Sequence, residues 1–291
     1  MTKHPHSPAA SPSYPVFTPE MKKTHLILVP DMLTVHIGLI LSVFESNGYQ
    51  TQMLTGGGQA VVDEGLKNVH NDTCYPALLV IGQFMNALKS GKYDPNRIAL
   101  LLPQTGGGCR ASNYISLLRK ALRKSFPQVP VISLNFSGLE ADSSIEVDLK
   151  VFLSLLDAVF YADILMLLYN QCKPYEVIEG QTDAVRAKWN KRLSRIFKNK
   201  GKHNRNAFYR KILKEFGEIE RKSVTKPKVG IIGEIYVKYS ALANNSLENF
   251  LLTEGCEPVV PLLSEFILYA TTAGFVNAKL YGHMNSSIVR N

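Results

Sequence analysis

The sequence predicts an α/β protein built on parallel sheets, because short apolar strands alternate with helical segments over most of its 291 residues. The segments 24–30, 97–103 and 129–136 are almost continuously apolar, as strands covered on both faces are. Alternation resumes at 228–234, after a long stretch with helical spacing. We therefore expect two α/β units joined by a helical segment.

Each part of the chain is assigned in order. Residues 1–23 are polar and rich in Pro and Ser, so we expect a disordered tail without the apolar core of a signal peptide. Residues 24–145 form the first α/β lobe, 146–226 a helical connecting segment with basic helices, and 227–291 the start of a second lobe. The expected strands are 24–30, 50–55, 97–103, 129–136, 228–234 and 257–261, and the expected helices outside the connecting segment are 35–48, 75–91, 111–126, 244–255 and 263–274. Two strands make a poor open sheet, so we expect the second lobe to be incomplete.

The longest apolar stretch, 151–172, approaches the length of a membrane span. It contains Asp157, Asp163 and Asn170, which are costly in lipid, so we interpret it as a buried helix. With no membrane segment expected, the predicted location is the cytoplasm. Four scattered cysteines match no small disulfide scaffold, and in a reducing compartment they are free thiols or metal ligands.

The net charge of +9 is concentrated in one segment. Between Arg186 and Lys228 there are 16 Lys or Arg residues and three Glu residues, a local charge of +13, which leaves −4 for the rest of the chain. One interpretation is two amphipathic helices with solvated basic faces. The others are a docking face for an acidic partner, for an anionic cofactor tail or for nucleic acid. No nucleic-acid motif accompanies the charge, so a nucleic-acid partner is not expected.

Two cysteines lie at predicted loop-to-helix junctions of the first lobe. Cys109 follows the glycines of "QTGGGCRAS" after a strand, and Cys74 in "NDTCYP" precedes a helix. Free amides and the helix dipole at such positions favour the thiolate, the form that binds metal. The backbone amides of Gly106, Gly107 and Gly108 can approach the sulfides of a cluster or a phosphate, although a purely structural turn is the alternative. The loop lacks the phosphate-binding Gly-Lys-Ser/Thr sequence and the dinucleotide fingerprint, so no flavin or nicotinamide motif is present.

Other residues near these junctions are weaker candidates. Arg110 can bind an anionic group, and Ser112 is a candidate catalytic residue or a helix cap. Glu234 follows a predicted strand and can relay protons or lie in a surface turn. His36 is a candidate proton donor, although a lone histidine in a helix is more often structural. Tyr114, close to Cys109, can donate a hydrogen bond to a substrate oxygen or simply pack.

Long motifs carry a resemblance to a known family. The stretch from Thr24 to about Asp183 resembles the 2-hydroxyacyl-CoA dehydratase D-component family through "HNDTCYPALLVIGQF", "QTGGGCRASNYI", "VPVISLNFSGLE" and "KPYEVIEGQTD". The segment "KPKVGIIGEIYVKYSALANNSLENFLLTEG" through "VVPLL" is similar to the later half of that family, in particular to the subfamily related to CoA-enzyme activases. The resemblance covers nearly all of the chain after its tail.

The resemblance implies two Rossmann-like (flavodoxin-like) lobes and a [4Fe-4S] cluster held by three cysteines. Cys74 and Cys109 match the first two ligands, and the third would lie beyond Asn291, so the resemblance implies a C-terminally truncated chain. It implies an iron–sulfur subunit that takes a low-potential electron from an ATP-dependent activator and reduces a CoA thioester. The reaction implied is the ketyl-radical dehydration of an acyl-CoA substrate. A homologous dehydratase subunit is a further partner that the resemblance implies. The alternatives are a non-catalytic member acting as a scaffold or electron-transfer partner, and an ATP-dependent reductase of another small substrate.

Overall fold

The computed structural model describes residues 14–70, 72–104, 110–135, 145 and 147–281. The chain divides into two compact units, which are described separately. The first unit comprises the chain up to Asp31 and from Gly48 to Val147, and the second unit comprises Met32–Asn47 and the chain from Asp148 onward. The molecule is a mixed α/β protein with a parallel sheet and flanking helices, as the sequence predicts.

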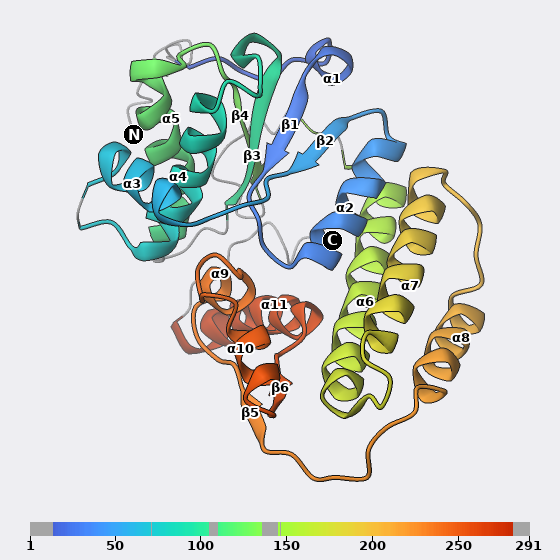
Figure 1. The fold of residues 1–291 in the computed structure, drawn as a ribbon. Helices are drawn as coiled ribbons and strands as arrows, with labels where there is room; N and C mark the ends of the chain where they lie inside the picture. The colour runs from blue at the N-terminus through green and yellow to red at the C-terminus, as the bar shows by residue number, and fades with distance from the viewer. Residues whose placement is uncertain (1–13, 71, 105–109, 136–144, 146, 282–291) are drawn as a thin grey trace. The chain divides into compact units, whose positions relative to one another are not determined.

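The first unit contains a four-stranded parallel sheet with the strand order β2-β1-β3-β4 (Figure 1). Its strands are β1 (Leu26–Val29), β2 (Gln50–Met53), β3 (Ile98–Gln104) and β4 (Val131–Asn135). The central strand β1 aligns Leu26 with Gln50 on one side and with Ile98 on the other. Ile27, Leu28 and Leu100 are almost fully buried, which explains the unbroken apolar pattern of these strands. All four predicted strands of this unit are confirmed.

Helices of the first unit include two that the sequence pattern does not predict, one of them at Met21–Thr24, in the stretch expected to be a disordered tail. They are α1 (Met21–Thr24), α3 (Gln59–Asn68), α4 (Tyr75–Lys89) and α5 (Tyr114–Ser125), with short 3₁₀ helices at Pro95–Arg97 and Arg110–Asn113. The helix α3 was not predicted because polar residues interrupt its apolar ones and it contains Gly65. Gly65 faces the backbone of Leu78, and Gly82 faces that of Val61, so α3 and α4 approach too closely for a Cβ at either glycine.

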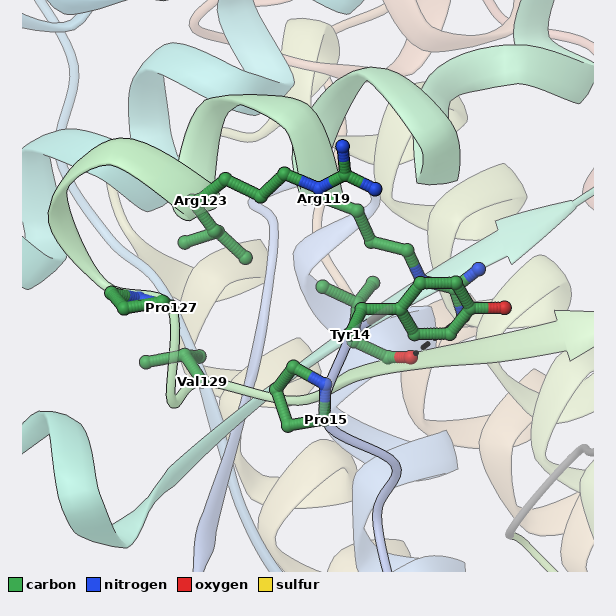
Figure 2. A pocket seen from close by; sticks show the side chains of 8 residues that line it. Tyr14, Pro15, Arg119, Arg123, Pro127 and Val129 are labelled. Carbon is green, nitrogen blue, oxygen red and sulfur yellow. Dashed lines mark hydrogen bonds between the residues drawn. The ribbon is translucent and has the colours of Figure 1, made fainter. Parts of the chain in front are cut away.

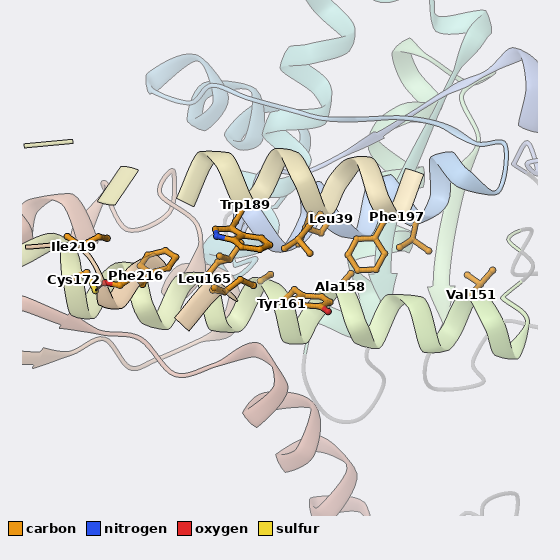
Figure 3. Close-up of a cluster of buried hydrophobic side chains, with 14 residues drawn as sticks. Leu39, Val151, Ala158, Tyr161, Leu165, Cys172, Trp189, Phe197, Phe216 and Ile219 are labelled. Atoms are coloured by element: carbon orange, nitrogen blue, oxygen red, sulfur yellow. Dashed lines mark hydrogen bonds between the residues drawn. The ribbon is translucent and has the colours of Figure 1, made fainter. Parts of the chain in front are cut away.

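The second unit is built around packed helices. It contains α2 (Thr34–Ser46), α6 (Leu149–Cys172), α7 (Gln181–Lys198) and α8 (Arg205–Gly217), with a 3₁₀ turn at Lys173–Tyr175. Side chains from α6 and α7, with Leu39 of α2, share one apolar cluster, in which Trp189, Tyr161 and Leu165 are fully buried (Figure 3). The predicted helical character of this segment is confirmed, and the helices are interrupted at Gly180 and Gly201. The structure groups α2 with this unit, although its sequence position is between two strands of the first.

The helix α6 is long and apolar, so we compared it with a membrane-spanning helix. The part of the chain that the structure describes contains one helical span, Leu149–Tyr175, whose length and apolar composition would allow it to cross a bilayer. Length and composition are the only criteria of this test. A core helix of a soluble protein passes the same test, and a single such helix is too little to indicate a membrane protein. Asp163 and Asn170 are buried on α6, and both have hydrogen-bond partners within the second unit. These contacts join α6 to its unit, but only 39% of its most apolar stretch is buried, and Leu149, Phe152 and Leu153 are exposed. The prediction of a buried helix therefore holds for part of its surface.

The remainder of the second unit contains a small parallel sheet. It consists of β5 (Lys228–Gly230) and β6 (Glu257–Val259), with α9 (Ile235–Tyr239), α10 (Leu247–Thr253) and α11 (Leu263–Tyr281). Leu33, Ile231, Tyr239, Leu251 and Val260 form a second apolar cluster in this unit. Within the described residues this sheet has two strands, as predicted.

Candidate functional site

The strand order of the first unit locates the place where a ligand would bind. From β1 the chain continues to β2 on one side, while β3 lies on the other side of β1, so the order reverses between β1 and β3. Open parallel sheets bind ligands at the carboxyl ends of the strands that flank such a switch point. Asp31 follows β1 closely, and the segment 105–109 follows β3 directly. The predicted site residues Gly106, Gly107, Gly108 and Cys109 lie in this segment, outside the described residues.

A buried glutamine connects two of the strand-end loops. The Oε1 atom of Gln83 accepts a hydrogen bond from the Asp31 amide at 2.9 Å, and its Nε2 atom donates to the Gly56 carbonyl at 3.2 Å. Gln83 is buried on α4, so both polar ends of its amide are satisfied inside the unit. The Asp31 carboxyl group is half-buried, and burial raises its pKa. The sequence offers one signal for Gln83, a single amide side chain in a mostly apolar stretch of the helix, and this did not suffice to predict its role.

Cys74 lies at a helix start and contacts the beginning of another helix. It is the N-cap residue of α4, and its Sγ atom lies 3.0 Å from the Tyr114 hydroxyl group at the start of α5. The Cys74 thiol is half-buried, and Tyr114 is buried. Cys109 precedes Tyr114 by five residues in the sequence and lies outside the described residues. Cys74 is therefore held beside the helix into which the predicted cluster loop leads.

Arg110 and Ser112 lie in the short 3₁₀ helix between the predicted cluster loop and α5. The N-cap residue of α5 is Asn113, so Ser112 is not the cap of that helix. Their backbone position is consistent with the prediction that both flank the loop of Cys109. Their roles toward a ligand stay predictions.

Glu234 and His36 both have structural partners in the second unit. Glu234 is the N-cap residue of α9, and its carboxylate accepts a hydrogen bond from the Val237 amide at 3.0 Å. His36 is buried on α2, and its Nε2 atom lies 2.8 Å from Oδ1 of Asp163. Each side chain is thus engaged in holding its own unit together. Both belong to the second unit, whereas Cys74 belongs to the first.

The other two cysteines lie in the second unit. Cys172 is buried in the helical core, where burial raises the pKa of its thiol, and its Sγ atom lies 3.8 Å from the Phe216 carbonyl oxygen. Cys256 is half-exposed next to β6. Among the residues that the structure describes, no group of three or more His, Cys, Asp or Glu side chains could hold a metal ion. The described residues therefore supply one of the two predicted cluster ligands, Cys74.

A small pocket lies near the other end of α5 (Figure 2). Tyr14, Arg119, Arg123 and Val131 are among its lining residues, and the Arg119 guanidinium group stacks 3.7 Å above the Tyr14 ring. Its volume of about 40 Å³ is enough for a water molecule and too small for a coenzyme. Val131 begins β4, so the pocket lies at the amino end of that strand, away from the strand-end loops.

Comparison with known proteins gives no relative: no family model, no curated protein and no solved structure matches this chain.

Proposed function

We propose that the chain is the iron–sulfur-cluster subunit of a 2-hydroxyacyl-CoA dehydratase-like system, located in the cytoplasm. One observation supports this most directly. The Cys74 thiol, at the N-terminus of α4, lies 3.0 Å from the hydroxyl group of Tyr114, five residues after Cys109. The proposal combines this contact with the resemblance of the motifs around both cysteines. The sheet order β2-β1-β3-β4 is compatible with the Rossmann-like lobe that the same resemblance implies.

Whether a [4Fe-4S] cluster can bind depends on which side chains are available as ligands to its iron atoms. Such clusters are held by cysteine thiolates, and in this chain Cys74 and Cys109 would be the ligands. The described residues contain only the first of them, so they do not form a complete cluster site. When bound, the cluster would supply a low-potential electron from an ATP-dependent activator to an acyl-CoA substrate. A homologous dehydratase subunit is a further proposed partner.

The described side chains suit the tasks that such a site requires. The Tyr114 hydroxyl group can donate a hydrogen bond to the Cys74 sulfur, and outer hydrogen bonds of this kind orient and tune metal ligands. Gln83 fixes the loops after β1 and β2 through its two hydrogen bonds. Leu100 and Leu101 of β3 are buried, so this part of the sheet is shielded from water.

Anaerobic reconstitution tests the proposal. The purified chain would be incubated with ferrous iron, sulfide and reductant, desalted, and analysed for bound iron, sulfide and visible absorbance. We expect iron and sulfide to be retained together, and to be lost in Cys74→Ala and in Cys109→Ala. Cys256→Ala is the matched control, because its half-exposed thiol lies in the other unit. Far-UV circular dichroism would confirm that all variants fold. Iron and sulfide retained equally in Cys74→Ala, Cys109→Ala and the natural sequence would rule the proposal out.

A further inference from the structure

The outer side of α7 bears a row of positive charge. Lys188, Lys191, Arg192, Arg195 and Lys198, here called the basic row, are all exposed. Their spacing of three or four residues places them along one side of the helix, over about 15 Å. The opposite side of α7 carries Trp189 and Phe197, which are buried in the core (Figure 3). Leu193, on the same side of the helix by its spacing, is also buried. The row is therefore a surface whose orientation is fixed by the packing beneath it.

Part of this charge is unneutralised within the protein. The Nζ atom of Lys188 lies 2.9 Å from Glu215, and that of Lys198 lies 2.9 Å from Glu45. In the described part of the chain, no carboxylate pairs with Lys191 or Arg195, at the middle of the row. The same holds for other exposed cations of this region, namely Lys202, Arg210, Lys211 and Lys222. Like charges held this close repel one another, so an anionic partner would be attracted to them.

The chemistry of the surface favours a protein partner over nucleic acid. The carboxylates of Glu215 and Glu218 lie among the cations of α7 and α8, where they would repel a continuous phosphate backbone. The two aromatic residues of α7, Trp189 and Phe197, are buried, so α7 itself offers no ring on which a base could stack. A folded protein can place its carboxylates opposite individual cations and avoid the carboxylates between them.

We infer that the basic row of α7 is a docking surface for a protein that presents a carboxylate-rich face. The apolar side chains of α7 are turned into the core, so the contact is mainly electrostatic, transient and sensitive to salt. This inference is independent of the proposed cluster, because it concerns the second unit and requires no bound group.

Fluorescence anisotropy with defined probes tests the inference on the whole chain. The probes are a labelled oligoglutamate peptide and, at equal formal charge, single-stranded and duplex DNA oligonucleotides, each titrated at low and at physiological salt. We expect the peptide to bind more tightly than either oligonucleotide, and to bind more weakly as salt rises. The double variant Lys191→Glu/Arg195→Glu should weaken peptide binding by roughly tenfold.

The matched control is Lys120→Glu/Lys124→Glu, which changes the net charge equally on exposed positions of α5 in the first unit. It should alter peptide affinity by less than about twofold. The fluorescence of Trp189 would show whether the α7 variant remains folded. Tighter binding of an oligonucleotide, no binding of the peptide, or equal losses in both double variants would each overturn the inference.

Discussion

His36 on α2 and Asp163 on α6 form a buried pair, in which His36 Nε2 donates to Asp163 Oδ1 at 2.8 Å. The same carboxylate accepts hydrogen bonds from the amides of Leu263 and Ser264, at the start of α11, at 2.8 and 2.9 Å. Burial alone would raise the pKa of Asp163, but these hydrogen bonds outweigh it and lower the pKa below its usual value. One ionised side chain thus connects three helices of the second unit, and this accounts for His36 without a catalytic role.

Replacing Asp163 with Ala should therefore destabilise the second unit strongly. The change leaves the His36 ring and two helix amides without their acceptor, at a cost on the order of 3 kcal/mol. Urea unfolding followed by the fluorescence of Trp189, the single tryptophan, measures this cost. The exposed Glu254→Ala in the same unit should change stability by less than about 0.5 kcal/mol. Equal effects of the two variants would contradict the assigned role of Asp163.

Glu176 should make the folded protein less stable as the pH falls in the acidic range. Burial would raise its pKa, but Lys173 and the amides of Gly180 and Thr182 lower the pKa to about 2. Because the folded pKa is depressed from 4.5, this stabilisation is complete above pH 4.5 and is lost as pH falls toward 2. Between pH 6 and pH 3 the loss should be about 2 kcal/mol.

The Glu176→Gln variant isolates that contribution from other titrating groups. The free energy of unfolding, measured in urea at pH 6 and at pH 3, should decrease for both proteins as the pH falls. The decrease should be smaller for the variant, and the two decreases should differ by about 2 kcal/mol. Glu254→Gln, at an exposed position, should leave the pH dependence unchanged. Identical pH profiles for Glu176→Gln and the natural sequence would show that Glu176 has no depressed pKa in the folded protein.

Gly82→Ala should disrupt the contact between α3 and α4. A Cβ at this position would overlap the Val61 carbonyl oxygen and approach the Gly65 amide to 2.8 Å. Both obstacles are backbone atoms that cannot rotate away, so we expect a loss of about 3 kcal/mol, measured by circular dichroism during urea unfolding. Gly38→Ala, with open space around its Cβ, should be neutral or stabilise by up to about 1 kcal/mol. A stable Gly82→Ala protein would mean that the two helices do not cross at these glycines.

The sequence predicts those helices and strands that are determined by their own local residue pattern, and it does not predict features that depend on contacts between distant segments. The strands of the first unit were predictable because each is an apolar run whose burial leaves a continuous pattern. The helix α3 was not, because the reason for its Gly65 lies in α4, beyond an intervening turn. Likewise, the grouping of α2 with α6 and α7 follows from side-chain packing between distant segments. Helix periodicity alone does not specify which partner covers a helix.

The candidate site likewise contains residues whose position could be predicted from the local sequence and residues whose position could not. The position of Cys74 at a helix start was predicted from the sequence around it, and it is confirmed, with Cys74 itself as the N-cap residue of α4. Gln83 and its two loops could not be predicted, since both hydrogen bonds span many residues of sequence. The roles of Cys109 and its glycines stay predictions, because these residues lie outside the described part of the chain.

The last prediction concerns Trp189, whose indole N–H is fully buried and donates to Glu215 Oε2 at 2.9 Å. Glu215→Ala would leave this donor without an acceptor in the core, at a cost of about 1 to 3 kcal/mol. Glu215→Gln retains an acceptor oxygen and should recover much of the loss. Glu218→Ala, which breaks only an exposed pair with Lys214, should cost less than about 0.5 kcal/mol. The folded emission spectrum of Trp189 should shift in Glu215→Ala and remain unchanged in Glu218→Ala, because only the first change removes the hydrogen-bond partner of the indole. An unshifted spectrum and unchanged stability in Glu215→Ala would show that this hydrogen bond does not form.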